Sequence, residues 1–461
     1  MPASSDLICV KAEGHGVPIS AIRSDQAETM IAALPEAQSA FAQAMVFDGR
    51  AGQILAIPDA DGALAQILFG LGEGADPFAV AALAETLPAG DYRFDPVPEG
   101  LDPSLVAYGC GLAGYRFDRF KSAPARRARL VAPPGVDPAE IGRLLDATAL
   151  ARDLINTPAG DLGPVALSQA ARDLAKRYGV EAEIIQGEAL ETGFPMVAAV
   201  GRAAEEAPRV AHFEWGPEDA PRLAVIGKGV CFDSGGLDLK PADGMRLMKK
   251  DMGGAAQALA LARLIMDAGL NVRLHLVLSI VENAIGGNAF RPGDILRSRQ
   301  GLSVEVDNTD AEGRLILADA LSFAAERAPA LMLDFATLTG AARVALGAEM
   351  TPFFATDDTI ADELTAAGVA EQDPVWRLPL YAPYKADLDS AVADMKNMGD
   401  RFFAGAIMAA LFMQRFVKDR PWVHFDVYSW NRHTRPGRPV GGEMMTVRAV
   451  YRVLRDRFGT R

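Results

Sequence analysis

The sequence predicts an α/β protein with a smaller N-terminal α/β domain and a larger C-terminal α/β domain whose mostly parallel sheet is covered by helices. Three observations lead to this prediction. The chain has 461 residues, which is too long for one ordinary compact core. From residue 139 onward, short apolar runs alternate with helical patterns, as is typical of parallel sheets with helices on both faces. Before this region, residues 121–138 are rich in proline and arginine.

The proline-rich stretch is expected to separate the two domains. Proline fixes its own φ angle and has no backbone N–H donor. A stretch that contains Pro124, Pro133, Pro134 and Pro138 is therefore more typical of a linker than of a helix or strand. We expect the N-terminal domain to span residues 1–122, the linker 123–138 and the larger domain 139–461.

The N-terminal elements are only partly regular. Apolar runs at residues 53–58 and 64–70 predict buried strands or short helices, and residues 78–87 predict a helix. The larger domain begins with helical periodicity over residues 139–155, where Ile141, Leu144 and Ile155 fall near one face. Its later strands are expected at residues 222–227, 272–282, 330–336 and 422–428, and its helices at 254–268, 315–327 and 404–417.

Composition excludes several classes of function. A formal net charge of −14 disfavours binding to nucleic acid or to anionic membranes. The three cysteines lie far apart and form no CxxC pair, so neither a zinc knuckle nor a disulfide framework is indicated. No apolar run approaches the ~20 residues of a membrane span, and the first ten residues lack the pattern of a signal peptide. We therefore expect a cytoplasmic protein without a membrane segment.

Three segments of the larger domain combine acidic side chains with glycine. They are residues 227–241, which contain Asp233, residues 250–254, which contain Asp251, and residues 307–315, which contain Asp310 and Glu312. In open α/β sheets, ligands bind beyond the carboxyl ends of the strands. If the four carboxylates converge there, two divalent cations would balance their charge, and hard oxygen ligands suit magnesium, manganese or zinc.

The alternative interpretation of each segment is structural. Asp-Gly and Asn-Thr-Asp sequences are common in turns and at helix N-termini. Asp310 would then cap the helix that begins near Leu315, and Asp251 would cap the helix expected from residue 254. Taken singly, each segment is more typical of a cap than of a metal ligand, so spacing alone supports a metal site only weakly.

Read together, the segments resemble the leucyl aminopeptidase (cytosol aminopeptidase) family. The octapeptide NTDAEGRL at residues 308–315 is similar to the family signature. The motifs that match in order and spacing are GKG at 227–229, FDSGG at 232–236, LKP at 239–241, DMGGAA at 251–256, ATLTGA at 336–341 and AGAIMAA at 404–410. The resemblance covers most of residues 150–430. The N-terminal part resembles the family's smaller domain more loosely, chiefly at residues 114–117.

The resemblance implies a metal-dependent aminopeptidase that releases N-terminal amino acids from peptides by metal-activated water. Residues 139–461 would then be the catalytic domain, with two divalent ions per subunit, zinc or manganese being the expected metals. By resemblance, Asp233 and Glu312 would each touch both ions, and Asp310 would complete one site. Lys228 and Asp251 would complete the other. A lysine ligand must be neutral, because a protonated ammonium has no lone pair.

Two further cations carry catalytic roles by resemblance. Lys240 would stabilise charge on the tetrahedral intermediate, and Arg314 would hold a bicarbonate ion that acts as general base. The substrate-binding residues implied by the family are Met248, Asn308, Thr337, Leu338 and Gly340. Peptides would be the substrates, and the resemblance also implies a homo-hexamer.

The chain departs from the family pattern at several positions, which include residues 435–443 near the C-terminus. Cys231 stands where many relatives have threonine or serine, and Asp238 adds a carboxylate near Lys240. Tyr428 and Trp430 follow a predicted strand where relatives often place small residues, at the wall of the specificity pocket. The resemblance therefore implies neither the preferred N-terminal residue nor the metal used in the cell.

Two other functions remain open at this point. A DNA-binding or regulatory protein on the same fold has some support from Arg126, Arg127 and Arg129, but the net charge disfavours it. A different two-metal hydrolase, such as a phosphoesterase, is disfavoured by the combination of lysine and carboxylate ligands. A zincin-type site has no support, because the five histidines form no HExxH motif, and His275 and His424 are expected in buried strands.

Overall fold

The computed structural model describes residues 8–9, 16–74, 76–122, 128–399 and 403–460. The chain forms two compact units, one of Met1–Ala149 with His433–Val440 and the other of Leu150–Arg432 with Gly441–Arg461. The predicted boundary after residue 138 coincides with the start of helix α5 (Pro138–Asn156). The compact units instead divide after Ala149, inside this helix.

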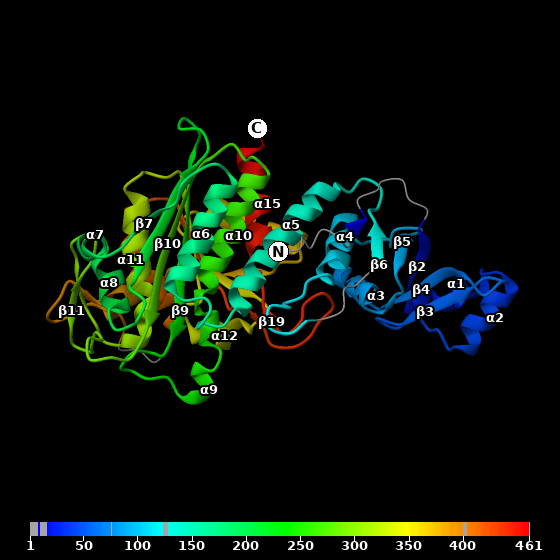
Figure 1. Ribbon diagram of the computed structural model, residues 1–461, viewed down its shortest axis with the longest axis horizontal. Coiled ribbons are helices and arrows are strands. Elements are labelled where there is room, and N and C mark those ends of the chain that lie inside the picture. The colour runs from blue at the N-terminus through cyan, green and yellow to red at the C-terminus, as the bar shows by residue number, and fades with distance from the viewer. Residues whose placement is uncertain (1–7, 10–15, 75, 123–127, 400–402, 461) are drawn as a thin grey trace. The chain divides into compact units, whose positions relative to one another are not determined.

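The smaller unit is built on a six-stranded sheet in the order β1-β6-β5-β2-β4-β3 (Figure 1). All neighbouring strands are parallel except β3 and β4, which form an antiparallel pair from the two apolar runs predicted as strands or short helices. The helix predicted at 78–87 is a 3-10 turn, Pro77–Val80, followed by a short α-helix. The elements are β1 (Ile8–Cys9), β2 (Val17–Arg23), α1 (Ala27–Ala32), α2 (Glu36–Ala44), β3 (Ile54–Pro58), β4 (Leu64–Gly72), α3 (Ala81–Thr86), β5 (Gly90–Phe94), α4 (Pro103–Leu112) and β6 (Ala128–Val131).

The larger unit has an eight-stranded sheet in the order β15-β14-β17-β13-β9-β10-β8-β7. Its four central strands are parallel, which confirms the predicted mostly parallel sheet. Antiparallel pairs occur only toward the edges, between β14 and β17, β8 and β10, and β7 and β8. The strands are β7 (Glu183–Ile185), β8 (Arg209–Trp215), β9 (Arg222–Asp233), β10 (Arg273–Asn283), β13 (Leu331–Ala336), β14 (Thr351–Ala355), β15 (Val375–Arg377) and β17 (Trp422–Asp426).

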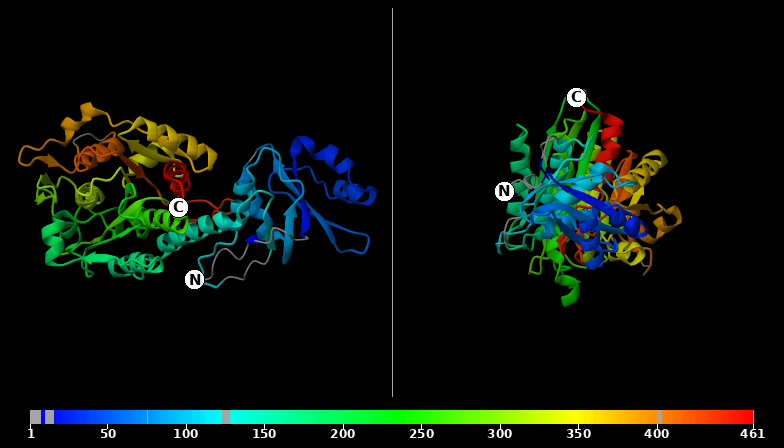
Figure 2. Two further views of the ribbon diagram at one scale, coloured as in Figure 1. Left: turned by 90° about the horizontal axis from the view of Figure 1, so that it is seen from above. Right: turned by 90° about the vertical axis from the view of Figure 1, so that its right-hand side faces the viewer.

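Helices cover both faces of this sheet (Figures 1 and 2). Successive strand residues point to opposite faces. Ala224 and Ile226 of β9 belong to one core cluster with α8 and α11, whereas Gly227 faces α10. A Cβ on Gly227 would lie 2.6 Å from the Cα of Ala255, so only glycine permits this approach. The helices are α6 (Pro164–Arg177), α7 (Glu188–Gly193), α8 (Pro195–Gly201), α9 (Ala242–Met245), α10 (Gly253–Asp267), α11 (Glu312–Ala325), α12 (Gly340–Leu346), α13 (Asp358–Ala370), α14 (Gly405–Gln414) and α15 (Val447–Phe458).

Strand β9 is longer than its apolar run predicted. We expected a short apolar strand over residues 222–227. The parallel pairing with β10 continues through Val230, and Asp233 lies opposite Asn283 after a register shift. The extension carries Lys228 within the strand and brings Asp233 to its carboxyl end. Short strands complete the unit, namely β11 (Ile295–Arg297), β12 (Ser303–Glu305), β16 (Met395–Lys396), β18 (Trp430–Asn431) and β19 (Gly441–Gly442).

Among the residues that the structure describes, no helix has the length and apolar character needed to cross a bilayer. His275 and His424 lie in β10 and β17 and are buried, as expected for core histidines. Of the basic cluster considered for DNA binding, Arg126 and Arg127 lie outside the described residues. Arg129 contacts the carboxylate of Asp91 at 2.6 Å.

Candidate metal centre

A cavity of about 450 Å³ lies at the carboxyl edge of the larger sheet and brings together all twelve residues that the sequence singled out. Its wall is formed by the ends of β9, β13 and β17 and by the segments that enter α10, α11 and α12. Ligand sites are expected at this edge of an α/β sheet. The twelve residues are Lys228, Asp233, Lys240, Met248, Asp251, Asn308, Asp310, Glu312, Arg314, Thr337, Leu338 and Gly340.

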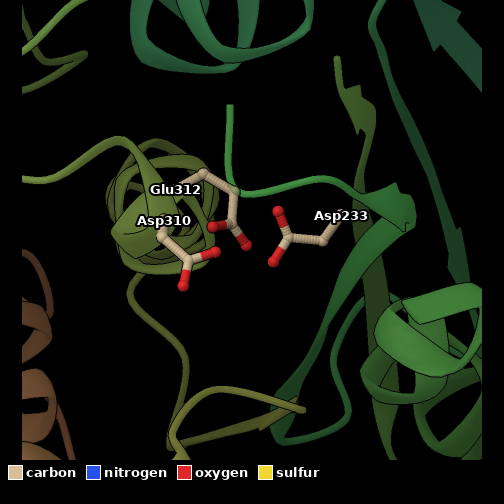
Figure 3. A group of neighbouring side chains, drawn as sticks. All are labelled: Asp233, Asp310 and Glu312. Carbon is tan, nitrogen blue, oxygen red and sulfur yellow. The ribbon is translucent and has the colours of Figure 1, made fainter. Parts of the chain in front are cut away.

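Three of the four predicted carboxylates converge on one point (Figure 3). Asp233 ends β9, Asp310 lies in the 3-10 turn Thr309–Ala311, and Glu312 is the first residue of α11. One oxygen from each lies within 4.8 Å of the others. Asp233 and Glu312 are buried, and Asp310 is half-buried. Such a group of oxygens matches the preference of divalent cations for several hard ligands.

The fourth carboxylate, Asp251, joins the group through Lys228. The Lys228 Nζ atom lies 2.8 Å from Asp251 Oδ2 and 3.0 Å from Glu312 Oε1, and it donates to the Thr337 carbonyl at 2.9 Å. The Thr337 hydroxyl donates to Asp251 Oδ1 at 2.8 Å. Asp251 and Lys228 are both almost fully buried. The carboxylate and the amine are therefore held in fixed positions beside Glu312.

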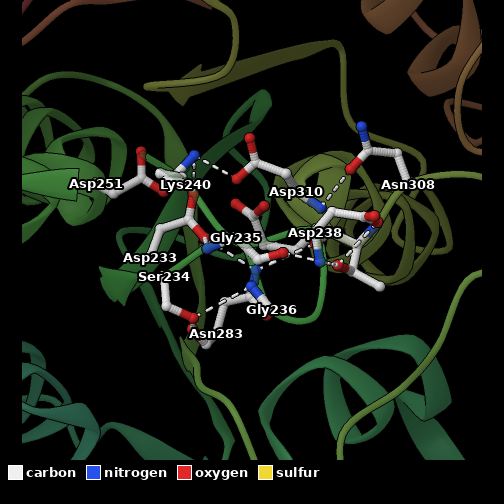
Figure 4. A network of polar contacts seen from close by, with 12 residues as sticks. Asp233, Ser234, Gly235, Gly236, Asp238, Lys240, Asp251, Asn283, Asn308 and Asp310 are labelled. Atoms are coloured by element: carbon white, nitrogen blue, oxygen red, sulfur yellow. Dashed lines mark hydrogen bonds and ion pairs between the residues drawn. The ribbon is translucent and has the colours of Figure 1, made fainter. Parts of the chain in front are cut away.

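Lys240 contacts the exposed side of the same cluster (Figure 4). Its Nζ atom lies 2.8 Å from Asp233 Oδ2 and also donates to Asp310 Oδ1. The backbone N–H of Lys240 donates to the Ser234 carbonyl at 3.0 Å, which fixes the loop that follows β9. This loop turns at Gly235 and Gly236, whose φ angles of +88° and +65° favour glycine.

The electrostatics of the cluster show an excess of negative charge. Burial, followed by the charge of Asp233, raises the pKa of Glu312 to about 8 and that of Asp310 to about 6. Burial alone would lower the pKa of Lys228 and of Lys240, but the surrounding carboxylates outweigh it and raise both. These four groups are shifted in the direction that reduces the net negative charge. At Asp251 burial is outweighed by the charge of Lys228, which lowers the pKa of that carboxyl. An added cation binds favourably in such an environment.

One buried oxygen indicates that the residues fit a metal ion. Within the described residues, Glu312 Oε2 is buried and has no hydrogen-bond donor. Leaving a carboxylate oxygen in this state is costly unless a cation or another donor contacts it. Asp233 Oδ1, by contrast, accepts from Asn283 Nδ2 at 2.9 Å and from the Gly235 N–H at 2.8 Å. These supporting contacts orient its carboxylate toward the shared point.

The helix-cap interpretation of the acidic residues is wrong. Asn308 caps the 3-10 turn before α11, because its side-chain oxygen accepts from the Asp310 N–H at 2.7 Å, and α11 itself has no side-chain cap. The carboxylate of Asp310 instead contacts Lys240. The carboxylate of Asp251 contacts Thr337 and Lys228, and α10 has no side-chain cap.

Several supporting residues were not predicted from the sequence. Asn283 ends β10, and besides Asp233 its amide contacts the Thr309 carbonyl at 3.1 Å. Among the described residues, Lys240 pairs with Asp233 and Asp310, and no ion pair joins it to Asp238. Its Oδ2 atom accepts from the Thr309 N–H at 2.7 Å and holds the loop that carries Asp310. Asn283 has no sequence signal beyond its place at the end of a strand.

Arg314 lies at the wall of the cavity with part of its guanidinium engaged. Its Nη1 atom donates to the Asn397 carbonyl at 2.9 Å, whereas its buried Nε has no acceptor within the described residues. Burial, opposed by the charge of Glu312, lowers the pKa of Arg314 to about 10, so the group stays cationic at neutral pH. A planar cation of this kind can pair with a flat anion.

The departures from the family pattern have different environments. Tyr428 lines the cavity, but Trp430 does not, and Trp430 is instead buried with its ring 5.4 Å from Lys249 Nζ. Cys231 is buried in β9, and burial raises the pKa of its thiol well above the usual range. This environment suits a small packed side chain and not a nucleophile.

The parallel sheet and the carboxylate–lysine cluster at its carboxyl edge together define a metal-dependent hydrolase. Comparison with known families identifies which one. Residues 149–451 match the catalytic domain of the cytosol aminopeptidase family, and residues 17–133 match the N-terminal domain of M17 aminopeptidases. The chain therefore belongs to the cytosol aminopeptidase family and is a metal-dependent aminopeptidase of the leucyl aminopeptidase type. This confirms the family, fold class and activity predicted from the motifs.

Relatives match over most of their length. The probable cytosol aminopeptidase of Caulobacter vibrioides is 39% identical over 372 residues, which are 77% of this chain and 75% of that protein. The one from Roseiflexus castenholzii is 38% identical over 424 residues, 85% of this chain and 86% of that protein.

Solved structures show the same architecture. The cytosol aminopeptidase of Coxiella burnetii superposes with a TM-score of 0.93 at 42% identity, covering 97% of this chain and 98% of that chain. The bottromycin maturation enzyme BotP in complex with Mn superposes with a TM-score of 0.86 at 35% identity, covering 96% and 99%.

Proposed function

We propose that the cavity holds two divalent ions, zinc or manganese, and that its residues use them to hydrolyse the first peptide bond of a peptide. In this proposal Asp233 and Glu312 each contact both ions, Asp310 completes one site, and Lys228 and Asp251 complete the other. When bound, the ions polarise the scissile carbonyl and lower the pKa of a bound water. The observation that carries the proposal is the convergence of Asp233, Asp310 and Glu312 within 4.8 Å.

Lys228 serves as a ligand only in its neutral form. The carboxylates around it raise its pKa, and positive charge placed among those carboxylates acts in the opposite direction. The contact from Nζ to the Thr337 carbonyl needs only one N–H, so the lone pair of the neutral amine can point toward the cluster. Burial removes the competing hydration of the ammonium and favours the same neutral form.

Lys240 and Arg314 act on the reacting groups. Lys240 is the cation on the open side of the cluster, and attack on a carbonyl creates an oxyanion that such a fixed cation stabilises. The Arg314 guanidinium lines the cavity and would hold a bicarbonate ion, which when bound would supply a general base. The contact with Asn397 keeps the Arg314 guanidinium in this position.

The substrate lies along the segment after β13. Met248, Thr337 and Gly340 line the pocket for its first side chain, the Leu338 carbonyl accepts from its backbone, and Asn308 is a further substrate-binding residue. Asp426 supports this segment, because its Oδ1 atom accepts from the Leu338 N–H at 3.0 Å and the Thr339 N–H at 3.1 Å.

We also propose that the enzyme is a homo-hexamer in the cytoplasm. Light scattering would test the oligomeric state, and cell fractionation would test the location.

The test combines metal content with turnover. Purified protein, freed of metal with a chelator, is dialysed against zinc, manganese, magnesium or cobalt and assayed on a panel of aminoacyl amides. We expect about two ions per subunit and turnover that depends on them. Glu312→Gln should lose at least about a thousandfold in turnover, which corresponds to ~4 kcal/mol. The exposed Glu181→Gln is the matched control and should retain turnover. Full turnover in Glu312→Gln would refute the assigned site.

A further inference from the structure

The wall of the cavity at Tyr428 carries two cations that the mechanism above does not use. The Arg343 guanidinium carbon lies 4.8 Å from the centroid of the Tyr428 ring, and Lys250 Nζ lies 5.2 Å from the same centroid. All three residues line the cavity that contains the carboxylate cluster. Tyr428 directly follows Val427 at the end of β17, and Arg343 lies on α12, one turn after Gly340.

Neither cation has a close carboxylate partner within the described residues. Arg343 is exposed, forms no ion pair there, and its Nη2 atom lies 3.7 Å from the point where a Cβ would project from Gly340. Lys250 is only 6% exposed, and its nearest carboxylate oxygen, Asp251 Oδ1, lies at 4.0 Å. With so distant a partner, the desolvation cost of the nearly buried Lys250 ammonium is poorly offset. An anion bound in the cavity would stabilise this charge.

The charge balance of the whole cavity also favours a bound anion. Five acidic residues line it, Asp233, Asp251, Asp310, Glu312 and Asp426, and so do five basic ones, Lys228, Lys240, Lys250, Arg314 and Arg343. These charges cancel. Two divalent ions, with Lys228 neutral and one bicarbonate at Arg314 as proposed above, would leave the loaded cavity with a net charge of two positive. A cavity of this sign favours an anionic substrate over a neutral one.

We propose that the enzyme prefers peptides whose first residue is aspartate or glutamate, with the side-chain carboxylate bound by Arg343 and Lys250 beside Tyr428. The inference rests on the proposed aminopeptidase function and names its substrate class. The planar guanidinium pairs with a carboxylate through two parallel N–H donors. The Tyr428 ring stacks with that guanidinium and narrows the space that a branched apolar side chain would need. Met350 and Pro352 line the same cavity and offer apolar contact to the methylene groups.

A purely structural role for Arg343 makes a different prediction. Exposed arginines often lie on aromatic rings without binding anything. In that case, removal of the charge would not change the order of substrates. A site that binds a carboxylate should instead favour acidic substrates strongly over leucine substrates, because a leucine side chain leaves the buried Lys250 without an anion.

The test compares aminoacyl p-nitroanilides of glutamate, aspartate, leucine, methionine and lysine with the metal-loaded enzyme. We expect kcat/KM for glutamate or aspartate to exceed that for leucine at least tenfold. Arg343→Gln should lower this ratio at least tenfold, and Arg343→Glu should make lysine a better substrate than glutamate. The ratio within one variant does not depend on the fraction of active protein, so partial misfolding does not affect it. The exposed Arg172→Gln, which removes a cation outside the cavity, should leave the ratio unchanged.

Two results would contradict the inference in distinguishable ways. If leucine or methionine is the best substrate and Arg343→Gln leaves the ratio unchanged, the preference is refuted while the aminopeptidase function stands. If no anilide is hydrolysed with any metal, the proposed function fails and the inference fails with it. As a second variant, Tyr428→Ala should raise kcat/KM for leucine and lower the ratio, because it opens the wall and removes the surface on which the guanidinium stacks.

Discussion

The Cε atom of Lys228 lies 2.6 Å from the point where a Cβ would project from Gly313, and its Nζ lies 2.7 Å from that point. Because Gly313 has no side chain, Lys228 can pass over the start of α11 and reach Glu312 and Asp251. Gly313 is helical and needs no special φ angle, so its role is to leave space. Gly313 is the second residue of α11, and the close approach of Lys228 explains why glycine is present there.

We expect Gly313→Ala to displace the Lys228 side chain from the carboxylates. The added methyl group overlaps the Cε and Nζ atoms, so the buried lysine must leave its position beside the carboxylates. Metal affinity should fall by about 10–100-fold, as for other changes that misplace a ligand. Metal titration followed by turnover at each metal concentration measures this.

Gly142→Ala is the matched control for that experiment. Gly142 lies inside α5, and nothing lies within 4 Å of the position its Cβ would take. This variant should gain about 0.5–1 kcal/mol of stability from helix propensity without affecting metal binding. Wild-type metal affinity in Gly313→Ala would show that Lys228 is not a ligand or that α11 moves aside.

Asn283 provides the second prediction. Its amide nitrogen contacts both Asp233 Oδ1 and the Thr309 carbonyl, so one buried side chain links two of the ligand-bearing segments. Asn283→Ala should weaken metal binding by about 10–100-fold. At saturating metal the turnover of this variant should return close to that of the wild type. The exposed Asn288→Ala, on the loop after β10, is the control. Loss of turnover that excess metal does not restore would contradict a purely supporting role.

The cluster was predicted through the resemblance to the family, whose ligands occupy short contiguous motifs, whereas spacing alone supported it only weakly. Asp310, Glu312 and Arg314 fall within one octapeptide, and their order along the chain is enough to bring them to the start of α11. The central strands were predictable for a similar reason, since a buried parallel strand is a continuous apolar run. The exception is β9, which was predicted over residues 222–227 although β10 pairs past residue 227.

The supporting contacts were not predictable, because they join residues that are distant in sequence. Asn283 contacts Asp233 across 50 positions and Asp426 contacts Leu338 across 88, and neither pair shares a motif. The cations around Tyr428 were missed for the same reason. Periodicity and spacing describe neighbours along the chain, whereas these contacts depend on the order of strands in the sheet.

Lys240 should affect turnover more than binding. Lys240→Met removes the cation on the open side of the cluster but none of the carboxylates. We expect kcat to fall by about 10²–10³-fold, as when one oxyanion donor is lost, with a smaller change in KM. Metal content measured on the same sample should remain near that of the wild type. A variant that loses its metal together with its turnover would mean that Lys240 maintains the site and does not act on the intermediate.

The last prediction concerns acid stability and lies outside the cavity. His275 is 4% exposed in β10, its ring packs edge-on against His212 and Phe323, and neither ring nitrogen has a hydrogen-bond partner within the described residues. Burial, followed by the positive charge of Arg327, lowers its pKa well below 6.5. The folded state therefore holds a neutral imidazole, while the unfolded chain takes up a proton as the pH falls below 6.5.

The sign of the effect follows from this difference. Stability due to neutral His275 is fully present above pH 6.5 and is lost as the pH falls toward the lower pKa of the folded state. At pH 5.5 the loss should be about 1.4 kcal/mol. Urea unfolding of wild type and His275→Leu at pH 7.5 and 5.5 measures it, and the leucine variant should lose less stability on acidification. The exposed His433→Gln is the control, and an equal loss in wild type and His275→Leu would mean that other groups account for the acid sensitivity.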